Sequence, residues 1–360
     1  MEEIQKLQKT TSDDGNVERW TTRYFGDRLR IYRIKAQVLP SLAGYIHLLL
    51  GENLPPSLID AGSGEGDCPG QILAGLETVN RQFERVLPSD IERIILTHTH
   101  VDHFGGVNEL KRLTNASVWV HRFESRVVSS YNERATVSNA RFASYCLDCG
   151  IEPDQVDVVL RGFGFLPGRI AATGVDRVLD DGISDGMMTF HHFPGHSAGG
   201  LGIAIGPILF SGDLILSKTL TQIWPASLFP FTGLDRYLDS IDRLAHWVTE
   251  TTQTTGCSPV IFPGHEEVVT DIPSRIALVK KSTLRRNGRT LDIIARATEP
   301  PTADEIARKL YLTSHSSRVF FAICDVGARL EYLQLHGELA VANYEQLPAM
   351  QHPVYRWRKV

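Results

Sequence analysis

The chain has 360 residues, of which 42% are hydrophobic, and its formal net charge is -5. Its longest apolar stretches, such as YIHLLLG at residues 45–51, are far shorter than the roughly 20 residues that cross a bilayer, which excludes a membrane-spanning protein. The N-terminus is polar and lacks the apolar core of a signal peptide, and the five scattered cysteines exclude a disulfide framework. We therefore expect a cytoplasmic protein with no membrane partner and with room for two domains.

The charge is distributed unevenly along the chain. Residues 271–360 hold 14 Lys and Arg against nine Asp and Glu, whereas residues 1–270 hold 23 against 33. Much of the basic excess lies between Arg275 and Arg289, a run of six basic residues without an acidic one. Such a run is typical either of a solvated helix face or of a surface that binds an anion.

The first third of the sequence predicts mainly strands. Residues 28–38 alternate between apolar and polar, and the β-prone runs at 45–51 and 57–62 follow, divided by Gly and Pro. The apolar run at 94–96 predicts another strand, and after it come a predicted helix and a further strand, at 108–114 and 117–121.

The middle of the chain first predicts helices and then returns to strands. Residues 123–159 have mostly helical character, and residues 160–174 have the composition of a loop. The later predicted elements are strands in MMTFHHFP (187–194), LGIAIG (201–206), ILFSGDLIL (208–216) and PVIFPGH (259–265), with a helix in LDRYLDSIDRLAHWVTE (234–250). Strands and helices mixed in this way predict an α/β or α+β catalytic body with helices covering sheet.

The last 70 residues have a different pattern. LDIIARAT (291–298) and TADEIARKL (302–310) predict short amphipathic helices, the second with a capping box formed by Thr302 and Glu305. A third helical pattern ends at Gly337, and the segments AVANYEQL and PVYRWRKV predict a hairpin. We therefore assign residues 1–275 to a catalytic domain and residues 276–360 to a linker helix and a small winged-helix domain.

A cluster of polar side chains follows the strand predicted at 94–96: His98, His100, Asp102 and His103. Residues two apart in an extended segment project to the same side, so His98 and His100 can reach one ion. Asp102 and His103 stand where the chain turns into a helix, which directs them to a neighbouring point. Because buried polar groups need partners, packing explains such a cluster poorly, and two metal sites explain it well.

One loop supplies too few ligands for two ions, and the sequence offers more at other predicted strand ends. His196 follows a Pro-Gly turn, and Asp213 and His265 each follow an apolar run. Asp60 stands between an apolar run and a glycine in LIDAGSG. Taken together, these elements predict that the remaining ligands come from several strand ends.

These motifs resemble those of the metallo-β-lactamase superfamily, in which HxHxDH is followed by two later motif histidines and an aspartate. The resemblance implies an α+β fold, the αββα sandwich, with the site at one edge of two facing sheets. It implies that one ion is bound by His98, His100 and His196, and the other by Asp102, His103 and His265. It also implies that Asp213 bridges the two ions and that Asp60 organises the site without binding an ion.

Imidazole and carboxylate ligands suit Zn²⁺, so we expect two zinc ions, with iron or manganese as alternatives. Two ions about 3.5 to 4 Å apart can share a water that ionises near neutral pH, giving a bridging hydroxide as the nucleophile. The motifs therefore predict a metal-dependent hydrolase. Asp102 would also accept or deliver a proton as the leaving group departs.

Departures from related patterns narrow the choice within the superfamily. The flavin-linked diiron oxygen reductases have the pattern HxExD in this loop, whereas position 100 of this chain is His, which disfavours that activity. Some lactamases have a cysteine ligand at the position of Asp213, so antibiotic hydrolysis of that type is also disfavoured. Persulfide dioxygenases and glyoxalase II enzymes share the ligands but not a winged helix. From about Arg28 onward the chain resembles a branch that includes a mitochondrial endoribonuclease acting on single-stranded RNA and fungal thioesterases.

Two classes of substrate follow from this resemblance. The first is a small-molecule acyl substrate with an ester, thioester or lactone bond, and the second is single-stranded nucleic acid, cut by an endoribonuclease or phosphodiesterase. Residues 291–360 hold eight basic and eight acidic residues, so we interpret the winged helix as a packing or dimerisation element, and a homodimer stays open. A metal-stabilised regulator that binds DNA through its tail is a third, more distant hypothesis.

Aromatic residues favour the acyl hypothesis over nucleic acid, because an apolar mouth suits an acyl group. A helical insertion at about 123–170 could fold over the site as a lid. The aromatic candidates are Tyr131, Phe142, Tyr145, Phe163 and Phe165 in this insertion, and Trp224, Phe229 and Phe231 further along. Aromatic side chains in such places also serve as core.

Overall fold

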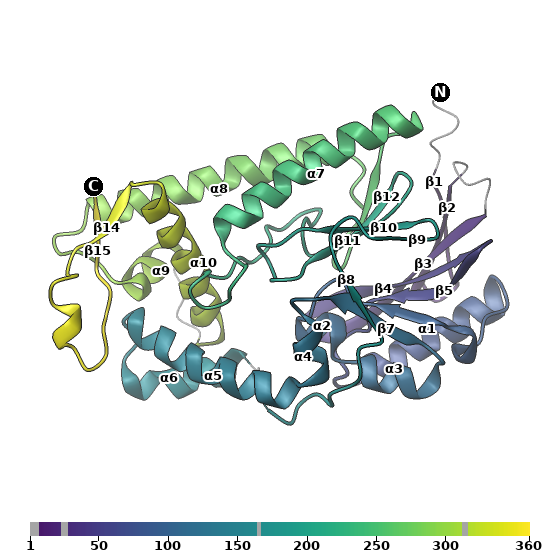
Figure 1. Cartoon of the computed structure of the whole chain (residues 1–360), viewed down its shortest axis with the longest axis horizontal. Coiled ribbons are helices and arrows are strands. Elements are labelled where there is room, and N and C mark those ends of the chain that lie inside the picture. Colours follow the sequence, from purple (N-terminus) through teal and green to yellow (C-terminus); the bar gives the residue numbers. More distant parts are fainter. Residues whose placement is uncertain (1–6, 23–27, 164–166, 312–315) are drawn as a thin grey trace. The chain divides into compact units, whose positions relative to one another are not determined.

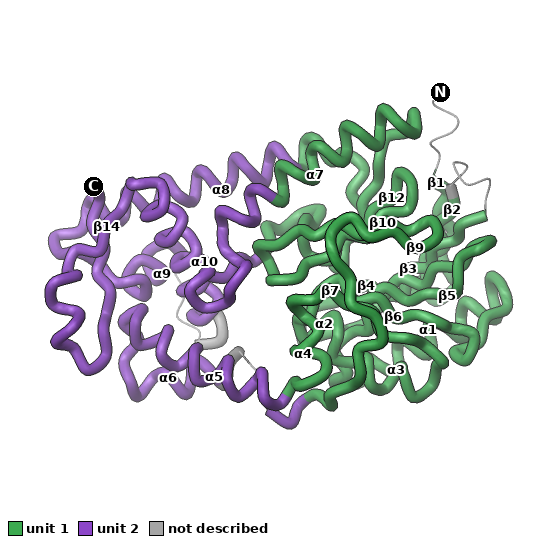
Figure 2. The backbone as a smooth tube through the Cα atoms, viewed as in Figure 1, with its two compact units in different colours: residues 1–131, 170–221, 240–275 green, residues 132–169, 222–239, 276–360 purple. Residues whose placement is uncertain are grey.

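The computed structural model describes residues 7–22, 28–163, 167–311 and 316–360. The chain divides into two compact units, each assembled from three segments (Figure 2). Unit 1 contains residues 1–131, 170–221 and 240–275, and unit 2 contains residues 132–169, 222–239 and 276–360. Among the described residues, no helix is long and apolar enough to span a membrane.

The larger sheet of unit 1 has its strands in chain order. They are β1 (Leu7–Thr11), β2 (Val17–Thr22), β3 (Leu29–Leu39), β4 (Leu42–Gly51), β5 (Leu54–Ile59), β6 (Arg93–Ile95), β7 (Ser117–His121) and β8 (Arg177–Leu179). The strands from β1 to β5 pair antiparallel, and those from β5 to β8 pair parallel. The carboxyl ends of β5 and β6 therefore lie side by side at one edge of the sheet.

The second sheet of unit 1 has the order β13-β12-β11-β10-β9. Its strands are β9 (Ser184–Asp185), β10 (Met188–His192), β11 (Leu201–Ile205), β12 (Ile208–Gly212) and β13 (Val260–Pro263). Every residue of β11 and β12 is buried, as expected for apolar strands covered on both faces. Because β12 and β13 pair parallel, their carboxyl ends also meet at one edge.

The two sheets face each other and share one core. Side chains of the larger sheet, such as Ile31 and Ile95, pack in the same buried cluster as Phe190, Ile203 and Phe262 of the smaller sheet. This cluster accounts for one of the two buried faces of β3 and for apolar residues in the runs of the other strands. Each strand that contributes to it buries at least one face between the sheets.

Helices cover the outer faces of this sandwich. In unit 1, Figure 1 shows α1 (Cys68–Gln82), α2 (Val101–Phe104) and α3 (Val107–Leu113) beside the larger sheet, and α7 (Leu234–Thr255, in unit 1 from Ser240) beside the smaller one. A Cβ atom at Gly75 of α1 would lie 2.3 Å from Ile34 Cγ2, so only glycine permits this close approach to β3. On the other side, the ring of Trp247 packs against His191 of β10. The predicted αββα sandwich is confirmed.

Unit 2 is mainly helical. Its elements are α5 (Tyr131–Asp148, in unit 2 from Asn132), α6 (Pro153–Phe163), α8 (Ile272–Ala295, in unit 2 from Ile276), α9 (Ala303–Tyr311), α10 (Ser316–Leu335), β14 (Leu339–Val341) and β15 (Trp357–Lys359). Its core joins Phe142 and Cys146 of α5 to Phe320 and Ile323 of α10 and to Trp357 of β15. Segments about 200 residues apart in the chain thus share one core.

The tail follows the sequence in part. The capping box of α9 is present, with Glu305 N donating to Thr302 Oγ1 at 3.2 Å and Thr302 N donating to Glu305 Oε2 at 2.8 Å. The separate helix predicted over residues 291–298 is wrong, because residues 291–295 form the last turn of α8. After its first turn α8 contains no Pro and a single Gly, the exposed Gly288, which does not interrupt the helix. The strands β14 and β15 pair antiparallel but are shorter than the predicted hairpin. The winged-helix assignment stays a prediction.

The aromatic side chains predicted to line a lid are largely core. Phe142 and Trp224 are buried in the core of unit 2, and Tyr131 is fully buried beside Phe104. The Phe163 side chain and the whole of Phe165 lie outside the described residues. The predicted lid at about 123–170, and the division into domains at residues 275 and 276, stay predictions.

Unit 2 contains a buried ion pair whose loss should destabilise it. Asp325 accepts two hydrogen bonds from Arg329, at 2.8 and 3.0 Å, and both residues are at most 5% exposed. Asp325→Asn should lower the free energy of unfolding by about 3 kcal/mol, because it leaves the buried guanidinium charge uncompensated. Urea unfolding of the full chain measures this change.

The matched control is Glu77→Gln, in the exposed pair that Glu77 forms with Arg81 at the same i,i+4 spacing. Exposed pairs of this kind contribute about 0.5 kcal/mol or less, so this variant should unfold almost as the wild type does. Equal shifts of the unfolding midpoint in the two variants would contradict the role given to the buried pair.

Candidate metal centre

The HxHxDH residues lie at the carboxyl end of β6, as the sequence predicts. The chain leaves β6 at Ile95, passes through His98 and enters α2 with His100 as its N-cap, so Asp102 and His103 lie in the first turn of that helix. His98 and His103 are buried, at 1% and 3% exposure. Asp102 keeps 13% of its side chain exposed.

The other candidate ligands come from the smaller sheet. Asp213 directly follows β12, His265 follows β13 after one glycine, and His196 lies in the loop between β10 and β11. All three side chains are at most 12% exposed. The parallel ends of β5 and β6 in one sheet and of β12 and β13 in the other thus bring these loops together.

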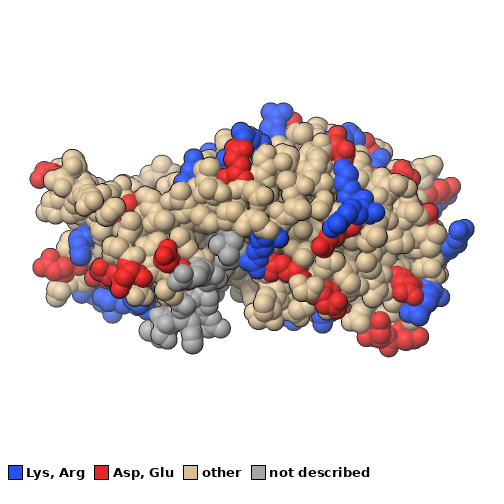
Figure 3. Space-filling view, turned by 90° about the horizontal axis from the view of Figure 1, so that it is seen from below, with Lys and Arg blue, Asp and Glu red and all other residues tan. Residues whose placement is uncertain are grey.

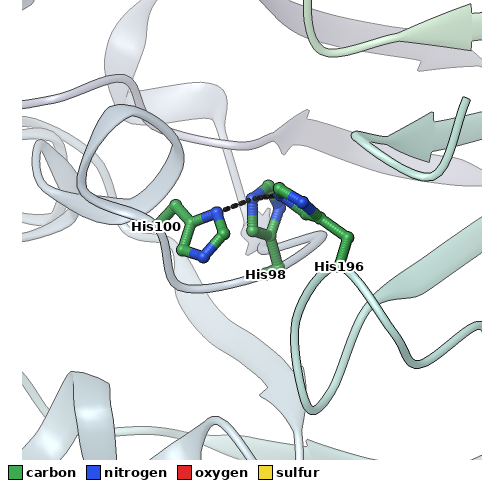
Figure 4. Close-up of side chains that lie close together, drawn as sticks. All are labelled: His98, His100 and His196. Carbon is green, nitrogen blue, oxygen red and sulfur yellow. Dashed lines mark hydrogen bonds between the residues drawn. The ribbon is translucent and has the colours of Figure 1, made fainter. Parts of the chain in front are cut away.

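Three histidines form the first group of converging donors, shown in Figure 4. His98 Nε2 lies 3.0 Å from His100 Nδ1 and 3.3 Å from His196 Nε2. A single proton on His98 Nε2 could form a hydrogen bond with only one of the other two nitrogens, so a shared cation explains the convergence of all three better. Donors placed about 2.0 to 2.1 Å from a tetrahedral Zn²⁺ ion would lie about 3.3 Å apart, which is close to these separations.

Asp102, His103 and His265 form the second group. His265 Nε2 lies 3.2 Å from both His103 Nε2 and Asp102 Oδ2, and His103 Nε2 lies 3.9 Å from Asp102 Oδ2. The donors are again nitrogen and oxygen atoms at separations that suit a shared cation.

Asp213 reaches both groups. Its Oδ1 lies 3.5 Å from His103 Nε2, and its Oδ2 lies 3.6 Å from His265 Nε2 and 3.8 Å from His196 Nε2. Oδ1 is buried and accepts no hydrogen bond within the described part of the chain. A buried carboxylate oxygen of this kind needs a positive partner, so the donor set fits metal ions.

Asp60 lies beside the second group and orients it. It directly follows β5 with a positive φ of 63° and accepts hydrogen bonds from His103 Nδ1 at 2.8 Å and from Thr97 N at 2.7 Å. The bond to Nδ1 directs His103 Nε2 towards the other donors. The structure thus brings together all eight residues selected from the sequence, while their roles as ligands stay predictions.

The two groups differ in their electrostatics. Burial, and then the neighbouring imidazoles, lower the pKa of His98 well below its usual value, and burial with His196 lowers the pKa of His100 to about 3. These two rings are therefore neutral, as metal ligands must be. Burial also opposes protonation of His103, yet the carboxylates of Asp213, Asp60 and Asp102 raise its pKa well above the usual value.

The carboxylates act on His265 of the second group in the same direction. Despite burial, Asp213 and Asp102 raise the pKa of His265 to about 9. The same pairing outweighs burial to lower the pKa of Asp102 to about 2 and the pKa of Asp213 well below its usual value. The carboxylates of this group therefore carry negative charge that a bound cation would neutralise.

Sequence reasoning missed two groups that position these side chains. Thr97 Oγ1 donates to the Asp60 carboxylate, and the Ala43 carbonyl oxygen accepts a hydrogen bond from His265 Nδ1 at 2.8 Å. Thr97 directly precedes HTHVDH in the sequence, but no sequence pattern indicates that it pairs with Asp60. Ala43 contributes only its backbone, which leaves no sequence signal.

Comparison with known proteins identifies the family. Residues 58–265, more than half of the chain, match the family model described as "Metallo-beta-lactamase superfamily". The chain belongs to this superfamily. The matched segment includes every candidate ligand, and the superfamily's use of divalent metal ions agrees with the donor set. The chain is accordingly a metallo-hydrolase of the superfamily.

Individual members of the superfamily cover more of the chain. A curated relative, "Probable metallo-hydrolase YqjP" of Bacillus subtilis (strain 168), is 24% identical over 83% of this chain and 89% of its own. Among solved structures, a metallo-beta-lactamase family protein of Thermus thermophilus covers 92% of this chain and 99% of its own, with 21% identity and a TM-score of 0.68. A beta-lactamase domain protein of Burkholderia ambifaria covers 98% and 94%, with 20% identity and a TM-score of 0.65. Both structures support the fold.

Replacing Asp213 should disrupt both groups of donors. Asp213→Asn keeps the shape of the side chain but removes the charge that three histidines share, so we expect the amount of divalent metal bound per chain to fall to half of the wild-type value or less. Elemental analysis after dialysis measures this, and His98→Ala should likewise lose metal and activity.

Asp181→Asn is the control, since Asp181 is a half-exposed carboxylate of unit 1 that pairs with Arg243 instead of a candidate ligand. It should keep the wild-type metal content. An Asp213→Asn protein that retains the wild-type metal content and full turnover would refute the assignment of ligands.

Proposed function

We propose that this metallo-hydrolase cleaves an ester, thioester or lactone bond of a small acyl substrate, with two zinc ions as cofactors and iron or manganese as alternatives. The observation that carries this choice is the structure of the basic run between Arg275 and Arg289. A nucleic-acid substrate would need these residues to be free for phosphate contacts.

At least three of the six basic residues in this run make contacts within the chain. Arg275 is buried and donates hydrogen bonds to the carbonyl oxygens of Leu216 and Thr219. Arg286 lies over the ring of Tyr311 with 5.9 Å between the guanidinium carbon and the ring centroid. Arg289 Nη2 donates to Leu310 O at 3.1 Å. These contacts favour a structural role for the run over the capture of a polyanion.

The charge distribution supports the same choice. On the face seen in Figure 3, Lys and Arg side chains are interspersed with Asp and Glu, and among the described residues of this face no continuous basic surface stands out. Residues 1–270 have ten more acidic than basic residues. Long-range attraction of a nucleic acid to this part of the chain is therefore disfavoured.

The chemistry assigned to the chain follows from the two groups of donors. His98, His100 and His196 would hold one ion, Asp102, His103 and His265 the other, and Asp213 would lie between them. Bound divalent ions lower the pKa of a shared water and polarise the bond under attack.

The remaining steps belong to the chain's own side chains. Asp60 keeps His103 oriented through its hydrogen bond to Nδ1. The partly exposed Asp102 carboxylate would accept the proton of the attacking water and return it to the departing thiolate or alkoxide. The burial of His98, His103, His196 and His265 limits access of bulk water to their donor atoms.

Thiol release from a panel of acyl-CoA thioesters tests the proposal. Protein loaded with zinc or manganese should release thiol, and the Asp213→Ala variant should not, because it lacks the carboxylate between the two groups. Chain-length preference within the panel would then define the acyl class.

A different result would move the assignment to the second class of substrate. If the wild-type protein holds metal, releases no thiol and opens no lactone, yet cleaves a single-stranded RNA oligonucleotide, the acyl proposal is wrong. Lys281→Glu and Arg285→Glu, at two exposed positions of the basic run, should then reduce RNA cleavage.

A further inference from the structure

Glu124 is a buried acidic residue that the ligand motifs do not include. It stands three residues after β7, as the N-cap of α4 (Ser125–Ser129), and is only 5% exposed. Its two carboxylate oxygens accept hydrogen bonds from two distant segments. Gly199 N donates to Oε1 at 2.8 Å, and Thr99 Oγ1 donates to Oε2.

Both of these segments carry histidines of the first group. Thr99 lies between His98 and His100, and Gly199 lies three residues after His196. One carboxylate therefore joins the loop of the larger sheet to the loop of the smaller sheet. The 3.3 Å separation of His98 Nε2 from His196 Nε2 spans the same two loops.

The loop after His196 is held closely at this point. A Cβ atom at Gly199 would lie 2.5 Å from Glu124 Cγ and 2.8 Å from His121 Nδ1, so a larger residue would force the loop away. His192 Nε2 donates to the carbonyl oxygen of the adjacent Ala198 at 2.9 Å, and the His192 ring stacks on His121 with centroids 4.0 Å apart. Contacts to the backbone of this loop therefore fix its position on two sides.

We propose that Glu124 is a positioning residue of the metal centre: by tying Thr99 to Gly199 it sets the position of His196 relative to His98 and His100. This inference rests on the proposed role of these histidines as ligands. Groups that orient ligands in this way typically change metal affinity about 10- to 100-fold when they are removed. The affinity of the three-histidine group should therefore depend on the Glu124 carboxylate, and that of the second group should not.

Zn²⁺ titration against a chromophoric chelator tests this dependence on the full chain. Glu124→Ala, which removes both hydrogen bonds, should weaken one of the two zinc sites about 10- to 100-fold and leave the other within about threefold. Thr99→Val removes a single hydroxyl and should give a smaller loss at the same site. Glu124→Gln, which keeps an acceptor for Gly199 N, should recover part of the affinity.

A double-mutant cycle separates positioning from general stability. In a His265→Ala background, Glu124→Ala should still weaken the remaining site. In a His196→Ala background, where the three-histidine group is already broken, it should have no further effect. Equal losses in both backgrounds would show that Glu124 stabilises the fold without positioning the ligands, and the proposal would fall.

Glu84→Gln is the matched control, because Glu84 is a half-buried acid of unit 1 that accepts hydrogen bonds from Arg30 and Tyr32, and none from a ligand loop. It should leave both zinc affinities unchanged. If Glu124→Ala fails to fold, the proposal is tested by Thr99→Val alone. A zinc affinity equal to that of the wild type in Thr99→Val would overturn the proposal. Failure of the wild type to bind zinc, iron or manganese would instead refute the metal centre itself.

Discussion

The carboxylate of Asp213 is the point on which the rest of the centre depends. It lies within hydrogen-bonding or ion-pairing reach of imidazoles from three loops, at 3.5 to 3.8 Å, and one of its oxygens is buried without a hydrogen bond among the described residues. A charge buried in this way is costly unless opposite charge surrounds it. The histidines that surround Asp213 come together because the parallel pairs β5–β6 and β12–β13 end near one another.

The site carries more negative charge than its neutral histidines can balance. The nearby carboxylates raise the pKa values of His103 and His265 above the usual value, although burial opposes this shift. In the other group, His98 and His100 stay neutral because burial and the neighbouring imidazoles lower their pKa values. The two halves of the centre therefore offer different environments to a metal ion, one neutral and one anionic.

Much of the fold and most of the site could be predicted from the sequence. The apolar runs of β4, β7, β11 and β12 reflect burial in the core, and β3 buries one face against the smaller sheet and the other against α1. The HxHxDH residues identify the strand end that they follow. The first two strands were not predicted, because LQKTT in β1 is mostly exposed and polar, and β2 is equally rich in polar residues. The helix α1 was missed because it begins with Cys-Pro-Gly, which resembles a turn.

The contacts that orient the ligands could not be predicted. Glu124 is bonded to residues 25 and 75 positions away, and Ala43 contributes a backbone oxygen to a histidine 222 positions away. No local pattern encodes such pairings, since they exist only after both sheets have assembled. The ligands could be predicted because clustered histidines and aspartates are unusual at strand ends. A single glutamate after a strand is common, so Glu124 could not be selected.

The interleaving of the two units has a practical consequence for dissecting the protein. The chain passes between the units at residues 131, 169, 221, 239 and 275, so neither unit is one continuous piece. A truncation after residue 275 would remove Phe320, Ile323 and Trp357 while retaining Phe142 and Cys146, which bury their side chains in the same core. The shortened chain would expose that apolar surface and aggregate, so the contribution of the C-terminal segment has to be measured by point substitutions in the intact protein.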